Sequence, residues 1–195
     1  MPQFGLFDNT LQVTTGNFRT ALDLFDSTQL NNKAQNTLGS IWCDAPTTIS
    51  NPNGTISIYK YVRYNSATNP AVVASPGPVY YTDATFQVVS GTMADGIGAN
   101  ANSVAGWLMP NTTDMSTLTN LKLNGNFVWI CIGGFLSQAI APAATAIGDA
   151  IIGAAGNFTN ARVAAGTAPT NKVLGWALTA VAAGKADYYV PWLLP

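Results

Sequence analysis

Charged side chains are scarce in this sequence, and histidine and glutamate are missing from it altogether. Only 9% of the 195 residues are charged, against roughly 25% in an ordinary soluble domain, and all 9 acidic residues are aspartates. The lack of histidine excludes nucleophilic sites of the Ser-His-Asp or Cys-His kind, and we expect no zinc or catalytic-metal site. Asn, Thr, Ser and Gly replace long charged side chains, which favours a flat surface suited to packing against other protein.

The 8 Lys and Arg residues are scattered and the net charge is −1, which argues against nucleic acid as a partner, because binding a phosphate backbone requires grouped cations. The most apolar window, residues 139–156, is interrupted by Pro142, Gly148 and Asp149 and is too short to cross a bilayer. The N-terminal residues lack the features of a secretion signal. We therefore expect no membrane partner and synthesis in a cytoplasm.

The two cysteines, Cys43 and Cys131, lie far apart in the sequence and have no metal-ligand spacing. Two interpretations remain open. Both can be small buried hydrophobic residues in a reducing compartment, or they can form a disulfide after release from the cell. Neither interpretation implies a cofactor, and we expect none.

The stretch from Ser103 to Gly134 is the most strongly patterned part of the chain. It contains Ser103-Val-Ala-Gly-Trp-Leu-Met-Pro, then a polar loop, then a second apolar run that ends in Gly133-Gly134. In a strand, alternate residues of that run point to opposite sides: Phe127, Trp129 and Cys131 to one side, and Val128, Ile130 and Ile132 to the other. Both faces are apolar, so we expect both to be covered by the chain itself or by a neighbouring subunit.

Short strand signals follow one another from residue 55 onward, separated by turn residues. Residues 55–64 are rich in Ile and Tyr, and 79–81 and 85–89 flank Thr82-Asp83 in a hairpin-like arrangement. Further strands are expected at 150–152, 160–164, 173–181 and 188–193. This spacing, with almost no helical periodicity, predicts a mainly β fold, either a β-sandwich or a barrel.

Two parts of the sequence share the same order of marker residues. Gly106-Trp107 and Gly175-Trp176 are 69 residues apart (175 − 106), and Pro76 and Pro142, each followed by an Asp-Ala pair, are 66 apart (142 − 76). Similarity at a nearly constant offset predicts two pseudo-repeats, at about 70–134 and 136–195, each with an apolar face that the other covers.

Residues 1–54 differ in character from the β domain predicted at 55–195, and the Pro52-Asn53-Gly54 turn marks the boundary. We interpret them as an irregular N-terminal arm. Phe18, Ala21, Leu22 and Phe25 follow helical spacing and predict one short helix, which would be marginal alone. The arm is either a lid on the β domain or a segment that docks on another protein.

Aspartates are the only carboxylates available for acid–base chemistry. A hydrolytic pair could be drawn from Asp83, Asp95, Asp114 and Asp149, but Asp83 and Asp149 hold matching positions of the predicted repeat, which favours a role in turns. We therefore expect no enzyme, and an Asp-dependent hydrolase is the least favoured hypothesis. Gly96-Ile-Gly-Ala-Asn-Ala has the letters of a dinucleotide fingerprint without the surrounding βαβ pattern, and is predicted to be a loop.

Several short motifs stand out between residues 58 and 195. They are Tyr61-Val-Arg-Tyr, Pro78-Val-Tyr-Tyr-Thr-Asp, Ser103-Val-Ala-Gly-Trp-Leu, Gly125-Asn-Phe-Val-Trp-Ile, Gly148-Asp-Ala-Ile-Ile-Gly, Val173-Leu-Gly-Trp-Ala-Leu-Thr-Ala and Ala182-Ala-Gly-Lys. This part of the chain resembles the small β-rich capsid decoration, or cement, proteins of tailed bacteriophages. The resemblance implies a homotrimer, or another symmetric assembly, on the capsid exterior of a virion. It also implies synthesis in the host cytoplasm, with the major capsid protein and further copies of the chain as partners.

The leading hypothesis is therefore a structural virion protein that reinforces contacts between major capsid subunits. The alternative is a fibre-head or adhesin module that binds a host-surface glycan through exposed aromatic rings. Large apolar side chains would make the contacts in either case, and the interface candidates are Phe18, Leu22, Phe25, Trp107, Trp129, Trp176, Tyr188 and Trp192.

Overall fold

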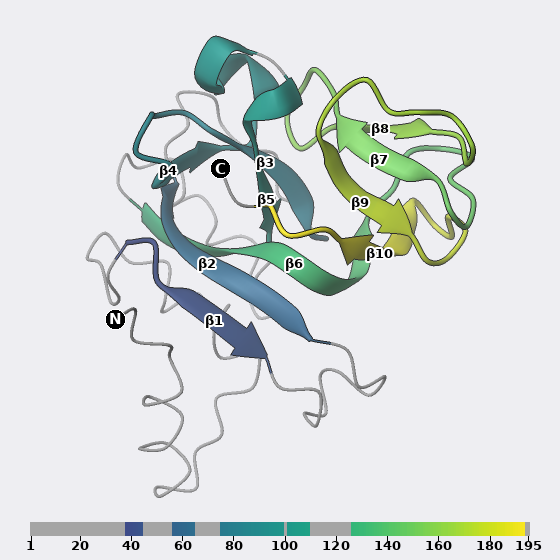
Figure 1. Ribbon diagram of the computed structural model, residues 1–195, viewed down its shortest axis with the longest axis horizontal. Coiled ribbons are helices and arrows are strands. Elements are labelled where there is room, and N and C mark those ends of the chain that lie inside the picture. Colours follow the sequence, from purple (N-terminus) through teal and green to yellow (C-terminus); the bar gives the residue numbers. More distant parts are fainter. Residues whose placement is uncertain (1–37, 45–55, 65–74, 100, 110–125, 194–195) are drawn as a thin grey trace, which may run out of the picture.

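The structure is a computed structural model that describes residues 38–44, 56–64, 75–99, 101–109 and 126–193 (Figure 1). Within these residues the regular elements are strands and three short 3-10 helices. The strands are β1 (Ile41–Asp44), β2 (Ser57–Tyr64), β3 (Gly77–Tyr81), β4 (Val88–Ser90), β5 (Val104–Leu108), β6 (Asn126–Ile140), β7 (Ala150–Gly153), β8 (Asn160–Val163), β9 (Val173–Ala177) and β10 (Lys185–Val190). The 3-10 helices are η2 (Met93–Asp95), η3 (Ile97–Ala99) and η4 (Ala101–Ser103). None of the described residues belongs to a helix with the length and apolarity needed to cross a membrane.

Five of the strands pair in a closed ring. β2 pairs in parallel with β4, and the antiparallel pairs β4–β3, β3–β5, β5–β6 and β6–β2 complete the circuit. β1 adds to β2 on the side away from β6, with Ile41 opposite Lys60. Closure of this kind removes the open edges that a flat sheet exposes.

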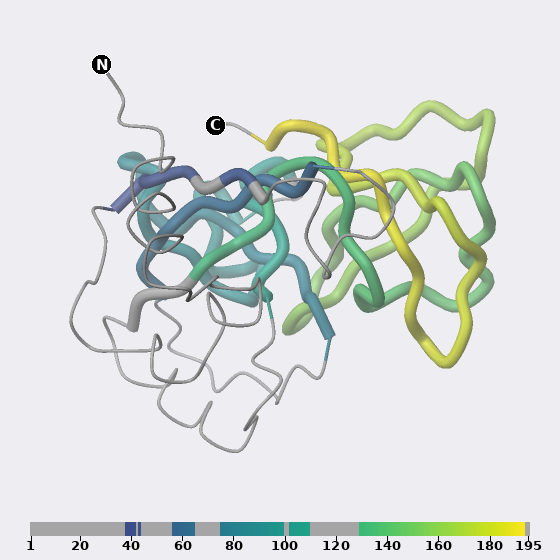
Figure 2. Tube along the Cα trace, turned by 90° about the horizontal axis from the view of Figure 1, so that it is seen from below, coloured from purple at the N-terminus to yellow at the C-terminus, as the bar shows by residue number. Residues whose placement is uncertain are grey.

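β6 joins the ring to a second sheet. Its residues up to Gly134 pair with β2, and those from Gly134 to Ile140 pair with β10. The order β6–β10–β9–β7–β8 defines the second sheet, in which all pairs are antiparallel. Glycine is required at the change of partner, because Gly134 has φ of +87° and an added Cβ would lie 1.7 Å from the Ile56 carbonyl oxygen. In Figure 2 the ring strands gather on the left and β7–β10 on the right, with β6 passing between them.

Two large aromatic side chains bind the ring to the second sheet. Trp107 of β5 is fully buried, stacks on Tyr188 of β10 with ring centroids 5.2 Å apart, and donates from Nε1 to the Leu174 carbonyl at 3.1 Å. Tyr80 of β3 is also fully buried, and its hydroxyl accepts a hydrogen bond from the Ala154 amide at 3.2 Å. These contacts merge the two parts into one hydrophobic core.

The predicted mainly β fold is confirmed. The hairpin around Thr82-Asp83 is present as β3 and β4, with Tyr81 opposite Val89. Both faces of β6 are covered along residues 129–132, which are all buried. The strand continues beyond its predicted end at Gly134, since β10 replaces β2 as its partner there. The choice between a β-sandwich and a barrel remains a prediction.

The predicted repeat remains a prediction, and its matched residues hold unlike positions. Asp83 follows β3, whereas Asp149 precedes β7. Trp107 is buried, whereas Trp176 is 38% exposed. One part of the predicted irregular arm, Ile41–Asp44, is a strand of the sheet. The helix predicted around residues 18–25 lies outside the described residues.

Candidate interaction surfaces

The loop between β6 and β7, residues 142–149, presents small uncharged side chains to solvent. Ile147 is 69% exposed, more than any other large hydrophobic side chain of the described residues. The loop backbone is nevertheless held in place: the Gly148 amide donates to the Ala177 carbonyl at 2.8 Å, and the Val181 amide donates to the Thr145 carbonyl at 2.9 Å. Ile147 is therefore displayed on a backbone that is already ordered.

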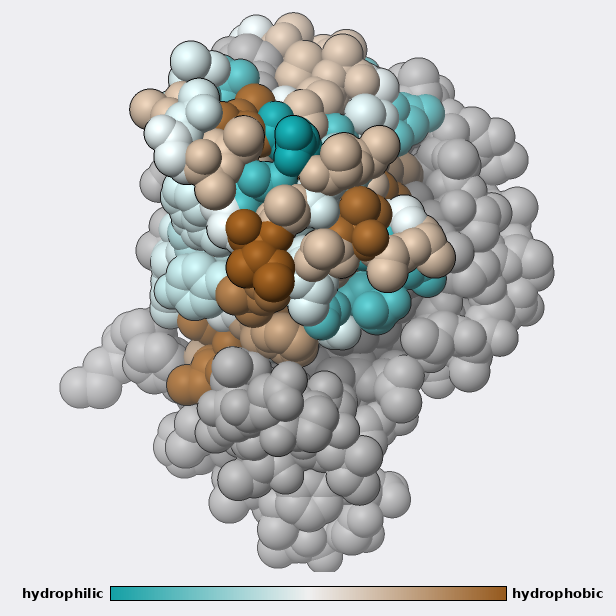
Figure 3. Space-filling view, turned by 90° about the vertical axis from the view of Figure 1, so that its right-hand side faces the viewer, coloured by the Kyte–Doolittle hydropathy of each residue, from teal (hydrophilic) through white to brown (hydrophobic). Residues whose placement is uncertain are grey.

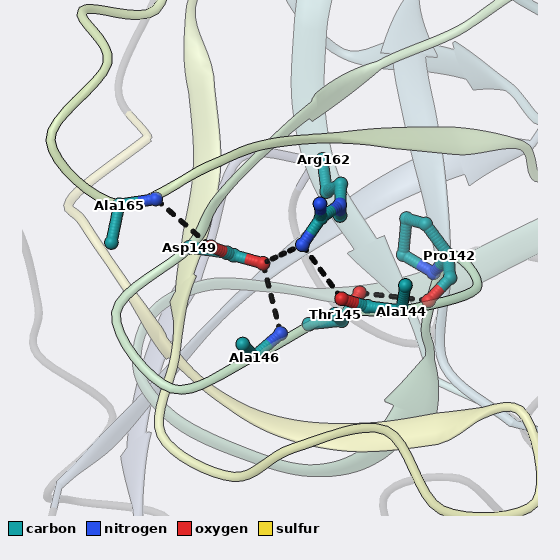
Figure 4. A network of polar contacts seen from close by, with 7 residues as sticks. All are labelled: Pro142, Ala144, Thr145, Ala146, Asp149, Arg162 and Ala165. Carbon is teal, nitrogen blue, oxygen red and sulfur yellow. Dashed lines mark hydrogen bonds and ion pairs between the residues drawn. The ribbon is translucent and has the colours of Figure 1, made fainter.

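Asp149 ties this loop to the neighbouring strand (Figure 4). The residue is only 2% exposed, and its carboxylate accepts hydrogen bonds from the Ala146 amide at 2.8 Å and the Ala165 amide at 2.9 Å. Arg162 of β8 donates to the same carboxylate at 2.9 Å and to the Ala144 carbonyl at 2.6 Å. One buried carboxylate thus holds together the loop, β8 and the segment after β8.

The surroundings of Asp149 favour its ionised form. The Ala146 amide, which donates to the carboxylate, is the main reason that the pKa of Asp149 lies below its ordinary value. Burial opposes this lowering of the pKa, and the Ala165 amide and the Arg162 guanidinium reinforce it. The arrangement is that of a structural carboxylate rather than of a group that exchanges protons with a substrate.

The end of the molecule formed by β7, β8 and their loops carries few charged side chains. Figure 3 shows this end, where brown hydrophobic atoms form separate patches among pale and beige ones, and teal atoms occupy small areas. Residues 164–168, which follow β8 and read Ala-Ala-Gly-Thr-Ala, are all exposed. We call residues 142–149 and 164–168 together the loop surface. A neutral surface of this kind can be buried against protein without removing charges from water.

A second exposed surface lies on the outer face of the second sheet. The strand register places Phe135 of β6, Tyr189 of β10 and Trp176 of β9 directly opposite one another, and residues opposite each other in a sheet point to the same side. Tyr189 is 53% exposed and Trp176 is 38% exposed. We call these three residues the aromatic row.

The predicted interface residues are divided by the fold. Trp107, Trp129 and Tyr188 are buried in the chain's own core, which corrects their prediction as surface contacts. Trp176 and Trp192 are 38% and 52% exposed and stay candidates. The three arm residues Phe18, Leu22 and Phe25 lie outside the described residues. The three buried residues each pack on an aromatic ring: Trp107 and Tyr188 on each other, and Trp129 on Tyr61, with ring centroids 5.1 Å apart.

Tyr189 and Ile147 are exposed side chains that the sequence analysis did not single out. Tyr188 and Tyr189 are adjacent in a strand, so one ring faces outward, but the pattern does not say which. Ile147 lies in a segment that has neither strand nor helix periodicity. The only sequence feature that could have indicated an exposed apolar side chain there was a single isoleucine next to Gly148.

The carboxylates considered for chemistry take part in local turns. Asp83 accepts a hydrogen bond from the Val88 amide at 3.0 Å, and Asp95 accepts one from the Ser90 hydroxyl at 2.7 Å. Asp83 and Asp149 therefore have the turn roles predicted for them, and Asp114 lies outside the described residues. Across the described ranges, no three Cys or Asp residues come together in a group that could hold a metal ion.

The two cysteines are both free. Cys131 on β6 is fully buried, and burial raises the pKa of its thiol to about 12. Cys43 on β1 is exposed. The interpretation of a small buried hydrophobic residue therefore holds for Cys131 alone, and no disulfide joins the pair.

No protein-family model, curated protein or solved structure matches this chain. The loop surface and the aromatic row are therefore the features from which a function can be proposed.

Proposed function

We propose that this chain is a structural virion protein that binds the outside of a phage capsid, as a homotrimer, and reinforces contacts between major capsid subunits. The observation that carries the proposal is the loop surface, where Ile147 is 69% exposed on a backbone held by the buried Asp149. Such a surface offers apolar area to a protein partner at little cost in ordering, because the loop is already fixed.

The neutral character of the loop surface supports a protein partner. Residues 142–148 contain no charged side chain, so none has to be desolvated when they are covered. Burying apolar surface contributes about 25 cal/mol per Å². On a shell with many equivalent positions, each additional tethered contact is effectively intramolecular, so weak individual contacts add up.

Attachment is tested with heads produced from the genome that encodes this chain but lacking the protein itself. Purified wild type and Ile147→Asp are added to these heads, and occupancy is measured by cosedimentation and cryo-EM. We expect Ile147→Asp to bind about tenfold more weakly or worse, because a charge would be buried in a neutral contact.

Ile97→Asp is the matched control, because Ile97 of η3 is 38% exposed and lies outside the loop surface. This variant should bind like the wild type. Absence of wild-type binding would refute the capsid role. Equal binding by Ile147→Asp and wild type would show that the loop surface is not the contact.

A glycan-binding module is the second candidate, and a different observation favours it. Trp176 and Tyr189 expose aromatic rings on a sheet face rather than burying them. Such rings have an apolar body and a polar tip, which suits contact with partly hydrated ligands. The two candidates use different side chains and are separated by different substitutions.

A further inference from the structure

The aromatic row presents its rings singly. Trp176 and Tyr189 are opposite each other on β9 and β10, yet among the described residues neither ring packs on another aromatic ring. Strands in a sheet lie about 4.8 Å apart, so the two side chains stand side by side on this face. Each ring is therefore available to a ligand.

A carboxylate of fixed orientation lies beside the row. Asp187 is two residues before Tyr189 on β10. The register with β6 shifts at Asp187, but burial keeps alternating along β10, so both side chains point to the same side of the sheet. Its Oδ1 atom accepts hydrogen bonds from the Ser137 hydroxyl at 2.9 Å and the Gln138 amide at 2.8 Å. Its own amide donates to the Thr179 hydroxyl at 2.9 Å. These contacts engage Oδ1 and leave Oδ2 as an acceptor without a partner among the described residues.

We propose that this face binds a neutral polysaccharide built of pyranose units, with Trp176 and Tyr189 stacking on sugar rings and Asp187 accepting hydrogen bonds from hydroxyl groups. A pyranose ring has a C–H face that suits an aromatic ring, and hydroxyl donors around its edge that suit a carboxylate oxygen. Aromatic rings and one acceptor of fixed orientation, side by side on one face of a sheet, offer both kinds of contact. This inference rests on the glycan-binding candidate proposed above and adds its ligand class and the role of Asp187. It is independent of capsid attachment, because it uses side chains outside the loop surface.

The charge of the face decides between possible occupants. A protein partner that covered Asp187 would bury a carboxylate, which is costly without a matching cation. Lys185, two residues earlier on β10, does not supply one, because Arg162–Asp149 is the only ion pair among the described residues. A polysaccharide leaves the site partly hydrated and supplies hydroxyl donors. By the same alternation Lys185 also points to this side, so the face carries one charge of each sign and favours a neutral polysaccharide over a charged one.

The test is affinity electrophoresis of the purified full chain in native gels that contain a soluble β-glucan, a soluble galactan, polygalacturonate or no polysaccharide. We expect at least one neutral polymer to retard the wild type, and polygalacturonate to retard it less. Trp176→Ala and Tyr189→Ala should each weaken binding about tenfold, the loss typical of a dominant aromatic contact. Asp187→Asn, which keeps an Oδ1 acceptor for Ser137 and Gln138, should weaken it less.

Phe86→Ala is the matched control, because Phe86 is an aromatic residue that is 37% exposed and lies between β3 and β4, outside the row. Its retardation should equal that of the wild type, and circular dichroism should show that all variants keep the strand signal. Lack of retardation by both neutral polymers would overturn the proposal. Equal losses in Trp176→Ala and Phe86→Ala would also overturn it. A third outcome would also overturn it: the wild type self-associates in sedimentation, Trp176→Ala does not, and no polysaccharide retards the wild type. That outcome would assign the face to a second copy of the chain.

Discussion

Removing the Asp149 carboxylate should lower the free energy of unfolding, and the hydrogen bonds around Asp149 determine by how much. Asp149→Ala leaves the Ala146 and Ala165 amides without their acceptor. Both residues lie at the surface, so water can replace part of each bond and the cost is about 1 kcal/mol per amide. The Arg162 side chain is 37% exposed, and losing its ion pair adds less than about 1 kcal/mol. We expect a total of about 2–3 kcal/mol.

This loss is measurable by urea unfolding and by thermal unfolding, each followed by tryptophan fluorescence. A change of about 2–3 kcal/mol should lower the midpoint temperature by about 4–12 °C in a chain of this size. Arg162→Gln is the informative companion, because it removes the cation while the two amides keep their acceptor. It should cost less than about 1 kcal/mol. A larger loss for Arg162→Gln than for Asp149→Ala would refute the view that the backbone amides dominate.

The pH dependence provides a second test of the same carboxylate. The pKa of Asp149 is lower in the folded chain than its ordinary value, so the folded state favours the ionised form. The stabilisation is therefore complete above about pH 4, the ordinary carboxyl value, and is lost as the pH falls through the folded pKa. The difference between wild type and Asp149→Ala should shrink in acid. A difference that stays constant from pH 7 to pH 3 would contradict this assignment.

Two further substitutions test the junction between the ring and the second sheet. Gly134→Ala should lower the free energy of unfolding by about 2–4 kcal/mol, because it combines positive φ with a Cβ only 1.7 Å from the Ile56 oxygen. Gly166→Ala is its control: Gly166 has φ of +85° but open space around it, so the loss in urea unfolding should be only about 1–2 kcal/mol. Tyr80→Phe should cost about 1 kcal/mol, because the hydroxyl no longer bonds the Ala154 amide and the Thr159 carbonyl, whereas the Ala154 amide keeps the Thr159 carbonyl as an acceptor. Since burial raises the pKa of Tyr80 to about 12, spectrophotometric titration of wild type and variant should differ only in strongly alkaline solution.

The two functional proposals are informative even when one fails. Ile147→Asp tests protein attachment through the loop surface, whereas Trp176→Ala and Tyr189→Ala test sugar binding through the aromatic row. A protein that binds heads but no polysaccharide would keep the structural role alone. One that binds polysaccharide but no head would be a glycan-binding module.

Local chemistry made several features of this chain predictable. Alternation of apolar residues in 127–132 predicted a strand covered on both faces, and residues 129–132 are buried. Turn residues at Thr82-Asp83 predicted the β3–β4 hairpin, because aspartate side chains accept hydrogen bonds from nearby amides. The scarcity of charge likewise predicted a neutral exterior, since no part of the fold can supply charges that the sequence lacks.

Other features were not predictable because they depend on which distant strands meet. The apolar run in the sequence ends at Gly133-Gly134, but strand β6 continues to Ile140 because β10 pairs with it there. The short strand β1 was missed inside the predicted arm, since four residues carry too little pattern to be recognised without β2 beside them.

The two Gly-Trp pairs show where the limit lies. By itself the sequence determined that Trp107 and Trp176 both belong to strands, because periodicity and turn spacing are local properties. Only the tertiary structure decided that Trp107 packs in the core against Tyr188 while Trp176 stands exposed beside Tyr189. The physical reason is that the side of a strand that becomes buried depends on the sheet and register that it joins, and those are set by partners far away along the chain.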